Sequence, residues 1–379
     1  MKRVDEESSP VVREIKGLIE EKGRIPFEEF MERTLYSPQG GYYSSKVDIW
    51  GREGDYLTSV DISPLFGRVL AKQVHEMWSL IGRPLNFHLI EVGAGRGDLS
   101  STILKAVDEE YPDLSAALSL ILIDSTPALS VEEGERVVHH NRIEDISGEV
   151  TGVILSNELL DAFPVHIVIQ EGEHLKEVYV ACEGSEFVEV CDKPSTPRLQ
   201  EYLTRAGVTL QRGQRLEVNL RALDWIERAG RLLKKGFVVT IDYGYPAREY
   251  FLPRRGGHLL CHYRHTVNEE PYRRVGRQDI TSHIDFSALA LYGRRSGLEV
   301  AGFTTQLNYL IGMGLLEELE EVKVFDEGGI GSIVKNQGIK RLIMPGGMGD
   351  IFKVLVQSKG VEVSKLAGFS FKDLKEVLC

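Results

Sequence analysis

The stretch Phe87-His-Leu-Ile-Glu-Val-Gly-Ala-Gly-Arg-Gly-Asp98 decides the fold of this chain. Its first six residues form a short apolar run, which predicts a buried strand. Gly93, Gly95 and Gly97 follow at alternate positions, and glycine permits the tight turns and close backbone approach that side chains prevent. Asp98 is expected to cap a helix that follows. A glycine loop between a strand and a helix is the context in which such loops bind ligands.

Strands and helices alternate on the C-terminal side of this stretch. The strands are nearly continuous apolar runs, which is typical of strands that are buried on both faces of a parallel sheet. The pattern therefore predicts an α/β fold with a doubly wound, Rossmann-like sheet that helices cover on both sides. The further strands are predicted over 118–124, 137–141, 152–156, 237–242, 298–304 and 352–357, and the helices over 126–136, 219–235, 286–291 and 307–319.

The domain organisation follows from where this alternation starts and pauses. Residues 1–85 are predicted to form an N-terminal helical cap, and 86–165 together with 219–379 the core, with an excursion over 243–285. The gap between the strands that end at 156 and start at 237 is longer than one crossover helix needs. Residues 166–218 are therefore predicted to be an inserted subdomain of antiparallel β-hairpins and a helix, with glycines in the turns.

Composition excludes several classes of protein. The 379 residues carry a formal net charge of −12, the opposite sign from that of most nucleic-acid binders, so we expect no nucleic-acid partner. No run of about 18 uncharged apolar residues occurs, so we expect no membrane span. The four cysteines form no C-x-x-C pair, which argues against a zinc site and a disulfide framework. The first ten residues lack an apolar segment, and we expect a cytoplasmic protein without a bound metal.

The spacing of the glycines decides between ligands. A dinucleotide site requires G-x-G-x-x-G, whereas the third glycine here comes one residue early and Asp98 takes its place. A carboxylate there would repel a pyrophosphate, so an oxidoreductase using a dinucleotide is a disfavoured alternative. No Gly-Lys-Ser/Thr follows, which excludes a P-loop.

S-adenosylmethionine (SAM) fits the carboxylates better, because it carries an ammonium and a sulfonium but no phosphate. Glu91 is expected to orient the ammonium and the loop. Asp124, at the end of the second strand, is expected to bind both ribose hydroxyls. Gly93, Gly95 and Gly97 would let the backbone contact the cofactor. The alternative is a glycine turn that binds no ligand.

The strand predicted over 152–156 is followed by three polar residues, Asn157, Glu158 and Asp161. In a doubly wound sheet these positions border the ligand crevice. A guanidinium has a pKa above about 12, so a methyltransferase must fix and polarise it with carboxylates. Two carboxylates and an amide therefore suit a cationic acceptor. The alternative is that Glu158 or Asp161 caps the following turn and pairs with an arginine.

The chain resembles the MidA-like methyltransferases, whose mitochondrial members are respiratory complex I assembly factors that dimethylate an arginine. The resemblance covers about residues 25–357. It implies a class I SAM-dependent methyltransferase fold whose N-terminal cap brings Asp55, Thr58 and Ser59 near the methionine end of SAM. The motifs that carry it are Ile25-Pro-Phe27, Tyr36-Ser-Pro38, Gly41-Tyr-Tyr43, the segment 54–67, the glycine loop, and the segments 157–164, 263–265, 278–286, 305–306 and 348–353.

The function that this resemblance implies is methylation of an arginine on a partner protein, of which a respiratory complex I subunit is one candidate. A non-catalytic assembly chaperone that binds SAM is the alternative. Residues 248–277 contain seven arginines against three glutamates, which indicates either recruitment of an acidic partner or pairing with surface acids. The helix predicted over 307–319 is interpreted as core, and a homodimer is left open.

Overall fold

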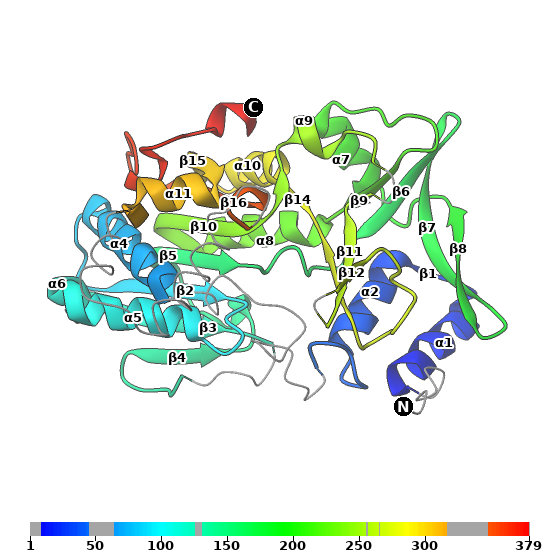
Figure 1. Cartoon of the computed structure of the whole chain (residues 1–379), viewed down its shortest axis with the longest axis horizontal. Coiled ribbons are helices and arrows are strands. Elements are labelled where there is room, and N and C mark those ends of the chain that lie inside the picture. Colours follow the sequence, from blue (N-terminus) through cyan, green and yellow to red (C-terminus); the bar gives the residue numbers. More distant parts are fainter. Residues whose placement is uncertain are drawn as a thin grey trace, which may run out of the picture. The chain divides into compact units, whose positions relative to one another are not determined.

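The computed structural model describes residues 9–44, 64–125, 131–254, 257–264, 266–316 and 348–378 (Figure 1). The chain divides into two compact units, and each is described here by itself. Unit 1 comprises Met1–Tyr56, Leu160–Asp224 and Ala247–Ile284. Unit 2 comprises Leu57–Leu159, Trp225–Pro246 and Asp285–Cys379.

A mixed sheet forms the centre of unit 2, and its strand order is β15-β16-β10-β5-β2-β3-β4. The strands from β4 to β10 are parallel, as predicted for a doubly wound fold. The predicted parallel arrangement does not extend to one edge of the sheet, where β16 runs antiparallel to both of its neighbours. A strand buried on both faces has the same apolar pattern in either direction, so its sequence does not reveal its orientation. The strands are β2 (Phe87–Val92), β3 (Leu118–Ile123), β4 (Val137–His140), β5 (Val150–Asn157), β10 (Leu233–Tyr245), β15 (Glu299–Thr305) and β16 (Phe352–Lys359).

Helices cover this sheet, and alternate strand residues such as Leu89, Leu120 and Val153 pack in one core with α4 and α5. Helix α10 packs against β10, β15 and β16. The helices are α4 (Pro64–Ile81), α5 (Asp98–Glu110), α6 (Pro112–Ala117), α8 (Leu220–Leu232), which begins in unit 1, α10 (Phe286–Arg295), α11 (Gln306–Gly312) and α14 (Met348–Ile351), and the short 3-10 helices are η2 (Ile143–Asp145), η3 (Ala367–Phe369) and η4 (Lys375–Leu378).

Three predicted helices differ from the structure. Residues 131–136 form turns and a bridge in place of the end of the helix predicted over 126–136, and 126–130 lie outside the described residues. Helix α8 ends at Leu232, because Leu233 and Lys235 already pair with β5. Helix α11 ends at Gly312, where a turn follows.

Unit 1 contains two antiparallel sheets and several helices. The hairpins predicted over 166–191 are present, with Gly172 and Gly184 in the turns at φ values of 58° and 61°. Strand order is β1-β7-β6-β9, with β8 also paired to β7, and β12-β11-β13 in the second sheet. The elements are α1 (Pro10–Lys22), β1 (Ile25–Pro26), α2 (Phe27–Tyr36), β6 (His166–Glu171), β7 (His174–Glu183), β8 (Glu186–Asp192), α7 (Arg198–Ala206), β9 (Arg215–Val218), α9 (Ala247–Tyr250), β11 (Leu259–Tyr263), β12 (Thr266–Asn268), β13 (Asp279–Ser282) and β14 (Ile284–Asp285), which ends in unit 2.

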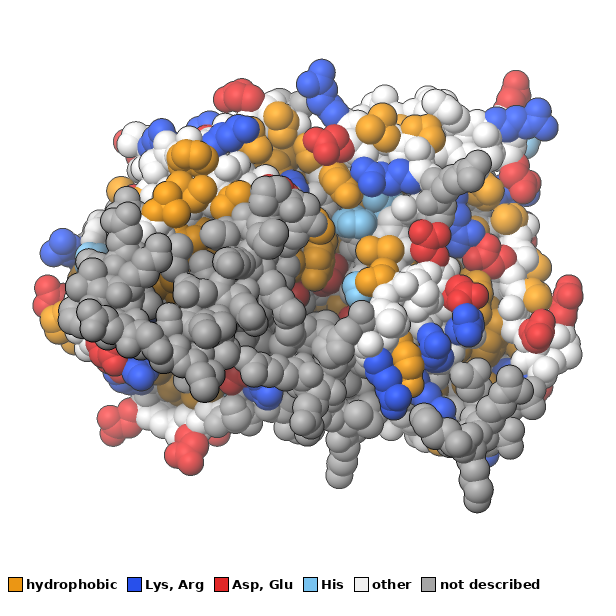
Figure 2. All heavy atoms as spheres, in the orientation of Figure 1, with side chains coloured by type: hydrophobic (Ala, Val, Ile, Leu, Met, Phe, Trp, Pro, Cys, Tyr) orange, Lys and Arg blue, Asp and Glu red, His pale blue; other side chains and the backbone are white. Residues whose placement is uncertain are grey.

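Charged side chains of both signs are interspersed on the face shown in Figure 2. Ion pairs in unit 1 include Arg198 with Asp224 and Lys22 with Glu29. Among the helices of the described residues, none has the length and apolar character that crossing a membrane requires.

Candidate active site

The glycine loop between β2 and α5 folds back onto the end of β3. The amides of Gly93 and Ala94 both donate to the carbonyl oxygen of Ile123, at 2.8 and 3.1 Å. Gly93, Gly95 and Gly97 have φ values of 74°, 55° and 81°, in the left-handed region that favours glycine. The backbone conformation alone therefore favours glycine at all three positions.

Protein side chains fill the space beside two of these glycines. A Cβ on Gly93 would lie 2.7 Å from Cδ1 of Leu159, and a Cβ on Gly97 would lie 2.7 Å from Cγ2 of Val131. The sequence interpretation attributed the need for glycine to close approach by a cofactor. At Gly93 and Gly97 the structure shows that packing within the protein already excludes a side chain.

Asp124 lies directly after β3, and its Oδ2 accepts a hydrogen bond of 2.7 Å from the amide of Gly95. This bond fixes the carboxylate beside the glycine loop. A carboxylate oxygen has two acceptor positions, so Oδ2 can accept a second donor such as a ribose hydroxyl. The arrangement fits the nucleoside of SAM, whose hydroxyls need an acceptor at this end of the sheet.

Glu91 is buried, with 4% of its surface exposed, and its Oε2 accepts from the amide of Ser100 at 3.2 Å. The N-cap of α5 is Gly97, which has no side chain, so Glu91 satisfies an amide that a capping residue would otherwise take. The prediction that Asp98 caps this helix is wrong. The Asp98 carboxylate instead accepts from Nε of Arg96 at 2.7 Å.

Burial raises the pKa of Glu91 to about 7. The hydrogen bonds from Ser100 act in the opposite direction, and the charges of Asp124 and Asp98 raise the pKa further. A carboxylic acid that titrates near neutrality beside a glycine loop marks this end of the sheet as a functional site.

Asn157 and Glu158 follow one another at the carboxyl end of β5. Nδ2 of Asn157 donates to Oε1 of Glu158 at 3.2 Å, and the Glu158 amide donates to the carbonyl of Ile241 at 2.9 Å. Glu158 has a φ of 52°, a strained value for a residue with a Cβ. Oδ1 of Asn157 is buried without a hydrogen-bond partner in the described part of the chain. A strained backbone at a residue that carries a carboxylate, beside an unsatisfied amide oxygen, is typical of a ligand site.

Asp161 belongs to unit 1, where it is buried. Its carbonyl accepts from the amide of Ser282 at 2.9 Å, and the carbonyl of Ala162 accepts from the hydroxyl of Tyr36 at 2.9 Å. Three of the segments that carry the family resemblance therefore meet at Asp161. The predicted residues Asp55, Thr58 and Ser59 lie outside the described residues.

Sequence reasoning missed Asp242. It lies within β10, one residue beyond Ile241, which pairs with Asn157 in the sheet. Its side chain is fully buried, and Oδ1 accepts from the amide of Tyr243 at 2.8 Å. The signal was present, because Asp242 ends a predicted strand just as Asp124 does. Within the described ranges, no three His, Cys, Asp or Glu side chains are arranged to hold a metal ion.

The fold and this site together define a class I SAM-dependent methyltransferase. Residues 69–304 match the family model described as "Putative S-adenosyl-L-methionine-dependent methyltransferase". The chain belongs to this family, and SAM is its cofactor. The resemblance and the fold class that the sequence predicted are both confirmed.

Several known proteins are similar to this chain over most of its length. The protein arginine methyltransferase NDUFAF7 homologue of Drosophila melanogaster is 26% identical, and the match covers 94% of this chain and 86% of the Drosophila protein. Rat protein arginine methyltransferase NDUFAF7 is 27% identical, and the match covers 91% of this chain and 83% of the rat protein. A crystal structure of a Burkholderia thailandensis protein bound to S-adenosyl-homocysteine is 28% identical, with a TM-score of 0.88 over 99% of both chains.

Proposed function

We propose that this protein transfers a methyl group from SAM to an arginine of a partner protein. The mitochondrial relatives are named protein arginine methyltransferases, which supports arginine as the acceptor and a protein as the substrate. The residues at the end of β5 support a cationic acceptor. Among the candidates for the partner, the family resemblance favours a respiratory complex I subunit.

The observation that carries the proposal is the conformation of Glu158. A non-glycine residue keeps a left-handed backbone only where its surroundings enforce it, and here the bond to the Ile241 carbonyl does so. The bond from Asn157 orients the same carboxylate. A carboxylate held in this way can bind a guanidinium before the reaction and polarise it.

The roles of the other residues follow from this placement. Asn157 and Glu158 would present the guanidinium, and Asp161 would be a second carboxylate close by in the sequence. After transfer of the methyl group the nitrogen must lose a proton, which a carboxylate or water accepts. Glu91, the three glycines and Asp124 would hold SAM, which supplies an electrophilic methyl group. Asp55, Thr58 and Ser59 stay predicted contacts of its methionine end.

The direct test is incubation of purified protein with radiolabelled SAM and a lysate of its host, followed by mass spectrometry of the labelled protein. We expect label on an arginine. Glu158→Gln should lose transfer and keep SAM affinity, whereas Glu299→Gln, which removes an exposed carboxylate elsewhere in unit 2, should keep both. A non-catalytic chaperone would instead leave every protein unlabelled, and Glu158→Gln would still support complex assembly.

A further inference from the structure

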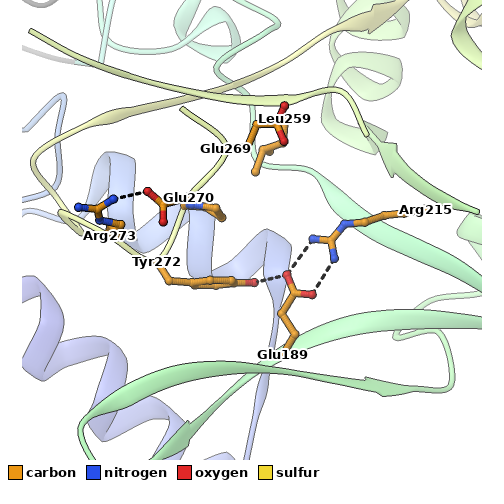
Figure 3. A pocket seen from close by; sticks show the side chains of 8 residues that line it. Glu189, Arg215, Leu259, Glu269, Glu270, Tyr272 and Arg273 are labelled. Atoms are coloured by element: carbon orange, nitrogen blue, oxygen red, sulfur yellow. Dashed lines mark hydrogen bonds and ion pairs between the residues drawn. The ribbon is translucent and has the colours of Figure 1, made fainter. Parts of the chain in front are cut away.

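Unit 1 contains a cavity of about 410 Å³ that no part of the proposed mechanism uses. Its size lies within the range of about 300–1,000 Å³ that is typical of ligand sites. Strands β8, β9 and β11 and the segment between β12 and β13 surround it (Figure 3). The residues that line it are Glu189, Arg215, Leu259, Glu269, Glu270, Pro271, Tyr272 and Arg273.

Three side chains form a fixed base for this cavity. Arg215 donates two hydrogen bonds to Glu189, at 2.6 and 2.8 Å, and the hydroxyl of Tyr272 donates to the same carboxylate at 2.8 Å. Burial alone would raise the pKa of Glu189, but the bonds from Arg215 and Tyr272 lower it overall. Glu189 therefore stays ionised and neutralises Arg215 over the physiological pH range.

The ring of Tyr272 is a rigid wall of the cavity. It packs against Phe27 and Phe30, with ring centroids 6.1 and 5.2 Å away. Its hydroxyl is held by Glu189, so both ends of the side chain are fixed. In Figure 3 the ring and the Glu269 side chain lie on opposite sides of the space.

The charges of the lining leave one carboxylate in excess. Three glutamates line the cavity against two arginines. Glu189 pairs with Arg215, and Glu270 pairs with Arg273. Glu269 is exposed and has no ion-pair partner among the residues that the structure describes. An anion would meet arginines that are already neutralised, whereas a cation would meet an available carboxylate.

We propose that this cavity binds an arginine or lysine side chain of the partner protein, at a position other than the methylated residue. Glu269 would pair with the charge, and the face of the Tyr272 ring would attract it. Leu259 and Pro271 would contact the apolar stem of the side chain. The inference rests on the proposed function only in identifying the partner as the methylation substrate.

This inference revises the expectation that segment 248–277 recruits an acidic partner. Arg273 pairs with Glu270, and the guanidinium groups of Arg264 and Arg274 lie over the Tyr263 ring at 5.3 and 4.4 Å. With Arg254, which donates to the carbonyl of Glu249, at least four of the seven arginines have partners within the unit. The surplus charge at the cavity is negative, so it favours a basic segment.

The test measures binding of a fluorescent peptide, Gly-Arg-Gly-Arg-Gly, to the full chain by anisotropy, with Gly-Glu-Gly-Glu-Gly as the comparison. We expect the basic peptide to bind more tightly. Glu269→Gln should weaken it about threefold and Glu269→Lys at least tenfold. Glu173→Gln and Glu173→Lys are the matched controls, because Glu173 is exposed on the β6–β7 turn of the same unit. They should leave the affinity within twofold of wild type.

Tyr272 provides a second, independent readout. Tyr272→Phe keeps the ring and should keep the affinity, whereas Tyr272→Leu should weaken it several-fold. Equal effects of the Glu269 and Glu173 variants, or tighter binding of the acidic peptide, would overturn the proposal. Repeating the measurement with Glu158→Gln excludes binding at the proposed acceptor site. If the wild-type protein methylates a lysate protein but does not bind the basic peptide, only the proposal for the cavity is rejected. If it binds the peptide but methylates no protein, only the proposed function is rejected.

Discussion

Glu91 Oε2 accepts the amide hydrogen of Ser100 at 3.2 Å, so a strand residue caps the helix that follows the glycine loop. The bond links the end of β2 to the first turn of α5, and the loop between them contains Gly93, Gly95 and Gly97. A capping side chain at Gly97 would meet Val131, whose Cγ2 lies 2.7 Å from the position of a Cβ there. Placing the carboxylate on the preceding strand satisfies the helix without a side chain at its N-cap.

The first prediction concerns pH. Burial raises the pKa of Glu91 to about 7, above the value of about 4.3 of an unfolded chain. Folding thus favours the protonated carboxyl, and this contribution to stability is complete below about pH 4.3 and is lost as the pH rises to about 7. The loss amounts to about 4 kcal/mol. Glu91→Gln keeps an acceptor for Ser100 and removes the titration.

Urea unfolding of wild type and Glu91→Gln between pH 4 and 8 measures this effect. The free energy of unfolding of the variant, relative to wild type, should rise with pH across the window and become constant above about pH 8. Because every other titrating group is common to both proteins, their contributions cancel in the difference. A difference that does not change with pH would contradict the prediction.

The second prediction concerns Gly93. Valine there would have to adopt a φ of 74° and would meet Leu159, so Gly93→Val should destabilise the protein by about 3 kcal/mol. It should also abolish SAM binding, because the loop can no longer hold its conformation. Isothermal titration with SAM measures the affinity, and wild-type affinity would contradict the assignment of this loop to the cofactor.

A double-mutant cycle separates the two causes of destabilisation at Gly93, which are the positive φ and the contact with Leu159. Gly93→Ala combined with Leu159→Ala removes the contact at 2.7 Å and leaves the backbone strain, which contributes about 1–2 kcal/mol. The loss of stability from Gly93→Ala should therefore be smaller in the Leu159→Ala background. Gly134→Ala is the control, since a Cβ on Gly134 meets no atom within 4 Å. Equal losses in both backgrounds would show that Leu159 does not constrain this position.

Features that depend on residues close together in the sequence could be predicted. Each parallel strand is an apolar run, and alternation with helices indicates the doubly wound fold. The sequence could place Glu91, Gly95 and Asp124 at one edge of the sheet, because parallel strands bring their carboxyl ends together there. That edge is where the Asp124–Gly95 bond is found.

Features that depend on distant contacts could not be predicted. Lys234 and Lys235 are good helix formers, and the sequence predicts a helix there. Leu233 and Lys235 of β10 instead pair with Val150 and Thr151, because tertiary pairing overrides local propensity. The left-handed conformation of Glu158 is set by a carbonyl more than 80 positions away in the sequence. The cavity around Tyr272 likewise joins residues from four separate segments.

The third prediction concerns the strain at Glu158. Glycine adopts a φ of 52° without the steric penalty, so Glu158→Gly should stabilise the protein by about 1 kcal/mol while abolishing methyl transfer. Thermal unfolding and the radiolabel assay measure the two effects. Arg83→Gly, at a φ of 53° elsewhere in unit 2, should retain activity. Lower stability of Glu158→Gly would show that the side chain contributes more to folding than the strain removes.

The last prediction concerns Gln73, which anchors the C-terminal segment to α4. Its Oε1 accepts from the hydroxyl of Tyr309 at 3.2 Å and from the amide of Gly368 at 3.3 Å. All three residues belong to unit 2 and are buried. Gln73→Leu leaves both donors without an acceptor, which should reduce the free energy of unfolding by about 3 kcal/mol. Adding Tyr309→Phe should recover about 1 kcal/mol, because one donor is then removed. Urea unfolding measures both, with Gln200→Leu on the exposed face of α7 as a control that changes little. No recovery in the double variant would show that the Tyr309 hydroxyl finds another acceptor.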